Sequence, residues 1–351
     1  MDTDSSDNSS SPSTPSTPQT FDRETLKKVT AGFKPGELIA DRYEVQKMLG
    51  RGGMGMVYLV WDREMQQPVA LKTLLPQYLS SSHAVKRFVR EVAAARQLDH
   101  PCIVKVYDAR QIGALLFYTM EYVDGVSLFK WIRKKGKLGL GSTVRILSLL
   151  CHALEHAHQF TVHRDISPDN VMVLRNGQVK LLDFGLAKLT NVQSAFTMIG
   201  VSLGKQDYMA PEQRLSAAGV DKRADIYSLG VLFYQLVSGE LPKLNTRLTD
   251  LVPDLPKETD DFVEKAMAQS ADERYQDARE FRLALAHIYK QATGISIPGT
   301  SEADLPEMKV QFSEPTPTPE TTDYVPGGAK PRGIWSRLLH AFGRLNPFRR
   351  R

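Results

Sequence analysis

The sequence HRDISPDNVMVLRNGQVKLLDFG, residues 163–185, carries the strongest pattern in the chain. It places two carboxylates, Asp165 and Asp183, and one carboxamide, Asn170, on short turns between apolar runs that are typical of strands. Oxygen ligands of this kind hold magnesium, and a further carboxylate is left to accept the proton of a hydroxyl. Asn170 lies five residues after Asp165, and Asp183 lies thirteen residues after Asn170. This spacing indicates a site for a divalent metal and a phosphate group rather than polar turns in an ordinary domain.

The composition limits the class of protein. A length of 351 residues suggests about two folding units, and 42% hydrophobic residues are enough to bury a core. The two cysteines, Cys102 and Cys151, cannot form a disulfide framework, which favours a reducing compartment. The N-terminus lacks a signal-peptide pattern, and no apolar run approaches the roughly 20 residues needed to span a bilayer. We therefore expect a cytoplasmic protein.

The net charge of +5 is unevenly distributed. Residues 324–351 contain seven Lys and Arg residues and no Asp or Glu, so the rest of the chain carries a net charge of −2. The basic character therefore belongs to the tail, and the body is not expected to bind nucleic acid. At the other end, residues 1–36 are rich in Ser, Thr and Pro, which predicts a disordered leader.

We expect the folded domain to begin near Glu37. From there, residues that alternate as in a strand lead into LGRGGMGMVY at residues 49–58. Gly50, Gly52 and Gly55 form G-x-G-x-x-G, and Val57 follows. Glycines let the backbone approach phosphate oxygens, which the N–H groups can then bind. The flanking residues alternate as two strands, whereas a helix would follow the motif in a dinucleotide-binding domain.

Lys72 ends the apolar strand Val69-Ala70-Leu71-Lys72, about twenty residues after the glycine motif. A lone lysine is usually a solvated surface residue, but this position suits an ammonium that pairs with phosphate. Residues 84–98 have helical spacing, with Glu91 near the edge of the apolar face. Further strands are predicted at 103–107 and 115–120, followed by a turn at 121–125.

The second half of the chain reads as helical. Residues 141–159 and 221–237 are expected to form long helices. The first contains Cys151, His152, Glu155 and His156, whose spacing resembles a metal site but lacks a second cluster of ligands, so we interpret them as structural helix residues. Strands early and helices late indicate an α+β fold with two lobes.

Residues 37–293 resemble the eukaryotic-like serine/threonine protein kinases of bacteria. The resemblance is carried by DRYEV, LGRGGMGMVY, HPCIVKVYD, MEYVDGVSL and YMAPEQ, in this order, together with HRD, Asn170 and DFG. It implies a bilobal protein-kinase fold, with a small β-rich N-lobe at 37–123 and a larger helical C-lobe at 124–293. It also implies ATP in the cleft between the lobes, protein substrates with Ser or Thr hydroxyls, and autophosphorylation in an activation loop at 186–208.

The resemblance also assigns roles to individual residues. Lys72 would pair with the α- and β-phosphates and with Glu91, and Asp165 would accept the proton of the substrate hydroxyl. Asn170 and Asp183 would hold two Mg²⁺ ions, which Mn²⁺ could replace. The nucleotide would lie under Gly50, Gly52 and Gly55. The adenine would bind the backbone of Glu121 and Val123 and lie between Leu49, Val57, Ala70 and Met172.

Other parts of the resemblance concern the large lobe. Arg164 would pair with a phosphate in the activation loop, on Thr190, Ser194, Thr197 or Ser202. Glu212 and Arg274 resemble the ion pair that braces this lobe. Asp225 resembles the helix aspartate that holds the backbone of the catalytic loop.

Two positions depart from the family pattern. The lysine usually found two residues after the catalytic aspartate is Ser167 here, and the usual threonine before the YMAPE sequence is Lys205. In the family these two side chains meet at the catalytic aspartate. We therefore hypothesise that Lys205 supplies the missing cation beside the γ-phosphate; the alternative is a solvent-facing Lys205 and catalysis without that cation. Because of these two departures, the alternative function is that of a pseudokinase, a scaffold that binds nucleotide without transferring phosphate.

The C-terminal part reads as a flexible linker at 294–329 followed by a basic amphipathic segment at 330–351. Ile334, Trp335, Leu338, Leu339, Phe342 and Leu345 share one helical face, and five arginines at 337, 344 and 349–351 supply cations. Such a segment can lie on an anionic membrane surface, bind a partner protein or dock on the kinase body. Of these three possibilities, we favour the first, in which the segment attaches a cytoplasmic protein to the membrane.

Overall fold

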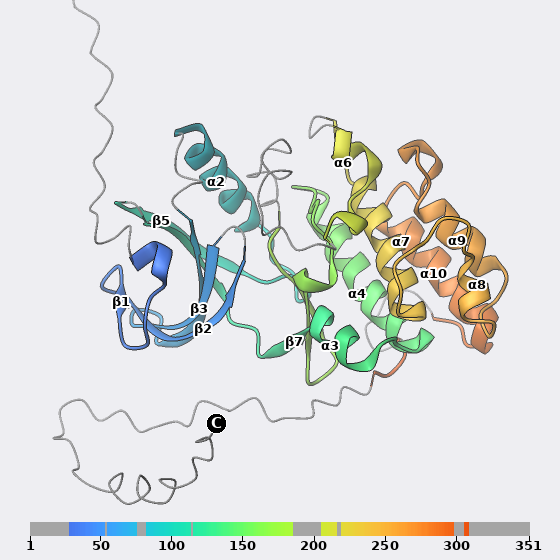
Figure 1. Cartoon of the computed structure of the whole chain (residues 1–351), viewed down its shortest axis with the longest axis horizontal. Helices are drawn as coiled ribbons and strands as arrows, with labels where there is room; N and C mark the ends of the chain where they lie inside the picture. Colours follow the sequence, from blue (N-terminus) through green and yellow to red (C-terminus); the bar gives the residue numbers. More distant parts are fainter. Residues whose placement is uncertain are drawn as a thin grey trace, which may run out of the picture. The chain divides into compact units, whose positions relative to one another are not determined.

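The computed structural model describes residues 28–52, 55–75, 82–113, 115–184, 205–215, 219–297 and 305–308 (Figure 1). Within these ranges the side chains at 82–84, 86, 87, 91 and 205 are not described. The predicted leader up to residue 27, residues 186–204 of the predicted activation loop and the tail at 330–351 lie outside the described residues. Within the described ranges, no helix combines the length and the apolar character needed to cross a bilayer.

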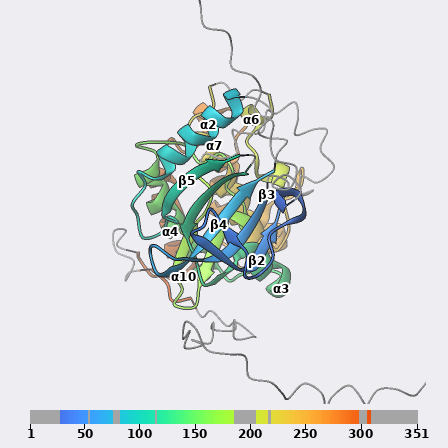
Figure 2. The same ribbon diagram turned by 90° about the vertical axis from the view of Figure 1, so that its left-hand side faces the viewer.

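The small lobe is built on a six-stranded antiparallel sheet with the strand order β1-β2-β3-β4-β6-β5. Its strands are β1 (Leu38–Ile39), β2 (Tyr43–Arg51), β3 (Gly55–Asp62), β4 (Gln67–Leu74), β5 (Val106–Ile112) and β6 (Leu115–Glu121). One helix, α2 (Ser82–Ala95), crosses a face of this sheet (Figure 2). The strands predicted around the glycine motif and Lys72 are confirmed as β2, β3 and β4.

Both faces of the sheet are packed, as the alternation along β6 shows. Leu116 and Tyr118 belong to the cluster that includes Phe88 and Val92 of α2. Phe117 points the other way, into a second buried cluster. The lobe therefore needs a cover on the face opposite α2.

Part of that cover comes from residues 28–36, which the sequence assigned to the disordered leader. Residues 28–31 are helical, and Val29 is fully buried in the second cluster. Phe33 packs edge-on against Tyr58 at 5.9 Å between ring centroids, and the Phe33 N–H donates to the Tyr58 hydroxyl at 3.1 Å. The folded domain thus begins before the predicted boundary at residue 37.

The large lobe combines a three-stranded sheet, β7-β8-β9, with a set of helices. Its elements are β7 (Gly125–Ser127), α3 (Leu128–Lys135), α4 (Leu140–Ala157), β8 (Val171–Leu174), β9 (Val179–Leu181), α6 (Pro211–Leu215), α7 (Arg223–Ser238), α8 (Leu248–Leu251), α9 (Glu258–Ala266) and α10 (Ala278–Thr293). Short 3₁₀ turns occur at η2 (Pro168–Asn170), η4 (Lys205–Tyr208) and η5 (Ala271–Glu273). The α+β, bilobal organisation predicted from the sequence is confirmed.

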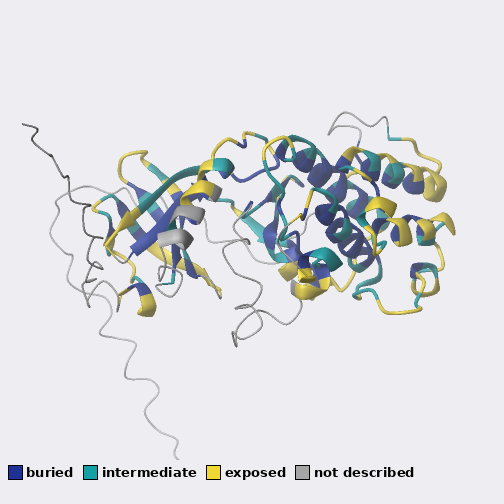
Figure 3. Cartoon of the chain, turned by 90° about the horizontal axis from the view of Figure 1, so that it is seen from above, coloured by how far each residue is buried: buried dark blue, intermediate teal, exposed yellow. Residues whose placement is uncertain are grey.

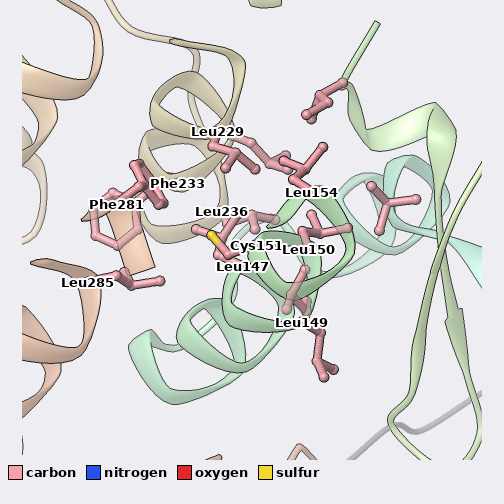
Figure 4. Close-up of a cluster of buried hydrophobic side chains, with 14 of the residues drawn as sticks. Leu147, Leu149, Leu150, Cys151, Leu154, Leu229, Phe233, Leu236, Phe281 and Leu285 are labelled. Atoms are coloured by element: carbon pink, nitrogen blue, oxygen red, sulfur yellow. The ribbon is translucent and has the colours of Figure 1, made fainter. Parts of the chain in front are cut away.

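The core of the large lobe lies where α4, α7 and α10 meet. Figure 4 shows Cys151 and Leu154 of α4 beside Leu229 of α7 and Phe281 of α10, and all four are buried. Figure 3 shows buried residues along helices of the large lobe and in strands of the small lobe. Cys151 is therefore a core residue, and Glu155 of the same helix is an ion-pair partner of Arg282 at 2.9 Å.

Two boundaries differ from the sequence prediction. The strand predicted at 103–107 begins only at Val106, because the residues before it pair with β9 instead: the Val104 N–H donates to Leu181 O at 3.0 Å. Inside the predicted flexible linker, Leu305 is buried in the large-lobe core, and Arg145 donates to the carbonyl of Pro306 at 3.4 Å. The linker prediction therefore does not hold for residues 305–308.

Candidate active site

Asp225 of α7 holds the backbone of the loop at residues 163–170. Its carboxylate accepts hydrogen bonds from the N–H of Arg164 at 2.7 Å and the N–H of His163 at 2.9 Å. His158 Nε2 lies 2.9 Å from the same carboxylate and must carry a proton to donate. Asp225 is fully buried, so these three donors replace the water that an isolated carboxylate would need. This confirms the interaction that the sequence resemblance implied for Asp225.

The ring of His163 joins this loop to the segment that carries Asp183. Its Nδ1 accepts from the N–H of Asp165 at 3.2 Å, and its Nε2 lies 2.8 Å from the carbonyl oxygen of Leu182. The two contacts fit one neutral tautomer, with the proton on Nε2. The buried ring also meets Phe184 edge-on at 4.6 Å. The backbone of Asp165 and that of Leu182, the residue before Asp183, are thus held by the same imidazole.

Asp165 and Asn170 lie side by side at the other end of the loop. The Asn170 Nδ2 donates both to the carbonyl of Asp165 at 2.7 Å and to its carboxylate at 2.8 Å. Asn170 belongs to η2 and is 5% exposed, so its orientation is fixed by packing as well. With Nδ2 engaged, the amide oxygen is the atom of Asn170 that can face a cation.

Lys72 of β4 reaches Asp183 across the boundary between the lobes. Its Nζ donates to Asp183 Oδ2 at 2.6 Å, and both side chains are mostly buried. The second carboxylate oxygen, Oδ1, accepts from the hydroxyl of Tyr118 at 2.6 Å. Asp183 has a φ of 58°, which an L-residue adopts at a cost and which such contacts help to maintain.

Several apolar residues predicted to surround adenine are packed in the small lobe. Ala70 and Met120 are buried, and Val57 and Val123 pack against their cluster. Leu49 is more exposed, at 38%. The backbone groups predicted to bind adenine are those of Glu121 and Val123, and Glu121 is the last residue of β6. This end of the strand is held in place by an ion pair between Glu121 and Lys180 of β9, at 2.8 Å.

The three glycines of the motif differ in whether a larger side chain would fit at their positions. A Cβ on Gly55 would lie 1.7 Å from the carbonyl oxygen of Thr73, so only glycine fits there. A Cβ on Gly50 or Gly52 would meet no atom within 4 Å. The first two glycines thus leave room for the close approach of another group to the backbone.

The segment that ends in YMAPEQ is fixed to the large lobe by polar contacts. Glu212 and Arg274 form a bidentate ion pair with two distances of 2.8 Å, and Arg274 is buried. Burial alone would raise the pKa of Glu212, but the hydrogen bonds from Arg274 lower it below its ordinary value. Gln213 joins this segment to the 163–170 loop, because its Nε2 donates to the carbonyl of Arg164 at 2.9 Å.

Arg164 itself is only partly engaged. Its Nη2 donates to the carbonyl of Val220 at 2.7 Å, and its buried Nε finds no hydrogen-bond partner among the described residues. Ser167 is 1% exposed, and its hydroxyl likewise lacks a partner within the ranges that the structure covers. The serine side chain is uncharged, so it does not supply the cation that a lysine at this position would.

The donor set fits a hard divalent cation. Asp183 offers carboxylate oxygens and Asn170 an amide oxygen. Asp183 is held by the donors of Lys72 and Tyr118, and Asn170 is held by donating to Asp165. The side chains of Glu91 and Lys205 and the loop residues Thr190, Ser194, Thr197 and Ser202 lie outside the described part of the chain. The predicted contacts of these residues therefore stay predictions.

Sequence reasoning missed three members of the site. His163 was quoted only as part of a motif, Gln213 as part of YMAPEQ, and Tyr118 as one residue of a strand. The contacts of Tyr118 and Gln213 join positions that are 65 and 49 residues apart in the chain. No local sequence pattern predicts such long-range pairs. A tyrosine in a buried strand does indicate that its hydroxyl needs a polar partner, but not which one.

Comparisons with known proteins agree with this geometry. A model of the protein kinase domain family matches residues 43–289. The chain is 35% identical over 273 residues to the serine/threonine-protein kinase PknB of Mycolicibacterium smegmatis, covering 72% of this chain and 44% of that protein. It is 32% identical to PrkC of Bacillus subtilis, covering 70% of this chain and 40% of PrkC. The chain thus spans less than half the length of these relatives.

The fold has counterparts among solved structures. The crystal structure of the Mycobacterium tuberculosis PknI kinase domain matches with a TM-score of 0.61 and 31% sequence identity, covering 73% of this chain and 99% of that domain. The family match includes the glycine motif, Lys72, the 163–170 loop and Asp183. The chain belongs to the protein kinase family and, within it, is similar to the bacterial eukaryotic-like serine/threonine kinases.

Proposed function

We propose that this chain is an ATP-dependent protein kinase that transfers the γ-phosphoryl group of ATP to Ser and Thr hydroxyls of proteins. One observation carries the proposal: Lys72 of the small lobe meets Asp183 of the large lobe at 2.6 Å, while His163 ties Asp183's segment to Asp165. The groups that phosphoryl transfer needs thus converge from two lobes. A scaffold that only bound nucleotide would not need Asp165 in this arrangement.

Each residue then has a distinct task. Asp165 accepts the proton of the substrate hydroxyl, and its hydrogen bond from Asn170 sets the direction of its carboxylate. Lys72 pairs with the α- and β-phosphates and, in the active state, with Glu91. The adenine lies between Leu49, Val57, Ala70 and Met172 and binds the backbone of Glu121 and Val123; Met172 is partly exposed in β8, as a contact residue should be.

Asp183 and Asn170 are the residues that would hold the divalent metal, which we propose to be Mg²⁺, with Mn²⁺ as a substitute. When bound, such ions neutralise negative charge on the phosphates. The protein's own contribution is to orient the two ligands before the metal arrives. Asn170 does so through Asp165, and Asp183 through Lys72.

Lys205 is proposed to supply the cation that Ser167 cannot. The support is indirect: Ser167 is buried, and Lys205 begins η4, whose last residue, Tyr208, is packed in the large-lobe core. Lys205→Ala should therefore cut turnover severely while nucleotide affinity stays unchanged. An unaffected rate would show that Lys205 faces solvent and has no part in transfer.

Regulation is proposed to act through Arg164. Its partly engaged guanidinium could pair with a phosphate on the 186–208 loop, placed there by autophosphorylation at Thr190, Ser194, Thr197 or Ser202.

The tail at 330–351 is proposed to bind an anionic membrane surface from the cytoplasm, on the basis of its amphipathic pattern alone. A partner protein and the kinase body itself are the alternative binding sites for that tail.

The proposed function can be tested with purified protein, labelled ATP and Mg²⁺. We expect label on Ser and Thr residues of the wild type, part of it within 186–208 as mapped by mass spectrometry. Label on tyrosine alone would contradict the substrate class, and label only outside 186–208 would remove the proposed switch at Arg164.

A further inference from the structure

Tyr118 occupies an unusual place beside the phosphate-binding lysine. In the ladder between β4 and β6, Tyr118 is the direct partner of Lys72, so both side chains leave the sheet on the same face. Tyr118 is 1% exposed, and the Lys72 Nζ lies 5.9 Å from the centre of its ring. Both side chains end at the same carboxylate, that of Asp183.

The two contacts hold different oxygens of Asp183. Lys72 donates to Oδ2 and Tyr118 to Oδ1, each at 2.6 Å. A single donor leaves a carboxylate free to turn about the Cβ–Cγ bond, whereas two donors on opposite oxygens fix its plane. A carboxylate oxygen has more than one lone pair, so both oxygens can still bind a metal while they accept these hydrogen bonds.

Tyr118 is itself well placed to remain a donor. Its ring packs against Phe88 of α2 at 6.0 Å and lines a small cavity with Val92 and Ala95. The phenol hydroxyl is a hydrogen-bond donor, and it donates to Asp183 Oδ1 at 2.6 Å.

A purely structural reading is that a buried phenol needs any partner it can find. Another buried tyrosine of the same chain argues against this necessity. Tyr234 of α7 is 2% exposed, and its hydroxyl has no hydrogen-bond partner among the residues that the structure describes. The bond from Tyr118 to the carboxylate of Asp183 is therefore a specific contact of this position, and the two tyrosines form a matched pair for a test.

We propose that Tyr118 is a positioning residue for the metal-binding carboxylate: its hydroxyl orients Asp183 so that the site binds a divalent cation together with ATP. This inference rests on the proposed function, in which Asp183 is a metal ligand. Hydrogen bonds that orient a metal ligand commonly account for about 10–100-fold in metal affinity. Tyr118→Phe removes the donor and keeps the ring.

The test compares wild type, Tyr118→Phe and Tyr234→Phe, the last as a control that deletes an unpartnered buried hydroxyl. A fluorescent ATP analogue is titrated into each protein, first with a chelator and then over a range of Mg²⁺ concentrations. We expect the metal-free affinity of Tyr118→Phe to stay within about twofold of wild type. The Mg²⁺ concentration for half-maximal enhancement should rise about tenfold or more, and Tyr234→Phe should match wild type.

Two outcomes would overturn the proposal. The first is an unchanged or lowered Mg²⁺ requirement in Tyr118→Phe, and the second is an equal loss of affinity with and without Mg²⁺, which marks a structural role. A wild type that binds the analogue without any response to Mg²⁺ would remove the proposed function as well. A wild type that responds to Mg²⁺ beside a Tyr118→Phe variant with the same response would remove this proposal alone.

Discussion

Replacing Asp225 by asparagine perturbs a fully buried carboxylate that accepts three hydrogen bonds. Asparagine keeps one oxygen, which can serve His163 and His158 from the side of Oδ2. Its NH₂ group would then face the N–H of Arg164, so one hydrogen bond is lost and two donors oppose each other. A bond to a charged group contributes about 1.5–3 kcal/mol, and an unsatisfied buried group costs about 1–3 kcal/mol. We expect a loss of about 3–5 kcal/mol in the free energy of unfolding.

The assay is urea unfolding of wild type, Asp225→Asn and His158→Ala, each followed by fluorescence. The shift in midpoint, multiplied by the slope m, gives the change in free energy. His158→Ala removes a single donor from the same carboxylate and should cost about 1–3 kcal/mol, less than Asp225→Asn. Turnover should fall in Asp225→Asn, because the backbone of the 163–170 loop carries Asp165. A variant within about 1 kcal/mol of wild type, which is the net value of one ordinary hydrogen bond, would refute this reading of Asp225.

Further predictions concern the glycine motif, the large lobe and the domain boundary. Gly55→Ala should destabilise the protein by about 3 kcal/mol or more, because its Cβ meets the next strand, while Gly50→Ala should cost no stability; thermal unfolding separates the two. Glu212→Gln should cost about 3 kcal/mol at neutral pH, since it leaves buried Arg274 without its countercharge. Because the folded pKa of Glu212 is lowered, its contribution is present above its ordinary value of 4.5 and is lost as pH falls through the folded value, so unfolding curves of variant and wild type should converge in acid. Val29→Ala should cost about 2 kcal/mol if residues 28–36 belong to the domain, and an unchanged melting temperature would return them to the leader.

The sequence predicted those parts of the site that depend on local spacing. The glycine motif, Lys72 and the 163–185 stretch each lie within one turn or hairpin, so their residue types and intervals identify them. Asp225 and Arg274 could be named only through the family resemblance. Their contacts are long-range, and the structure confirms them.

The remaining differences come from contacts that no local pattern encodes. Val29 is one of a few apolar residues in a mostly polar leader, and the average composition of residues 1–36 does not reveal its burial. The strand predicted at 103–107 is displaced because Val104 pairs with Leu181, a residue far along the chain. In the sequence, Tyr118 looks like any aromatic residue of a strand. Only the fold shows that its hydroxyl meets Asp183.

The central claim is that Asp165 performs transfer at a site where Asp183 holds the metal. It is tested most directly by measuring phosphoryl transfer and metal-dependent ATP binding on the same preparations of wild type, Asp165→Asn and Asp183→Asn. Asp165→Asn should bind ATP with Mg²⁺ as wild type does but transfer no phosphate, and Asp183→Asn should lose the Mg²⁺-dependent binding as well. Transfer by Asp165→Asn at the wild-type rate, or binding without transfer by the wild type, would contradict the claim.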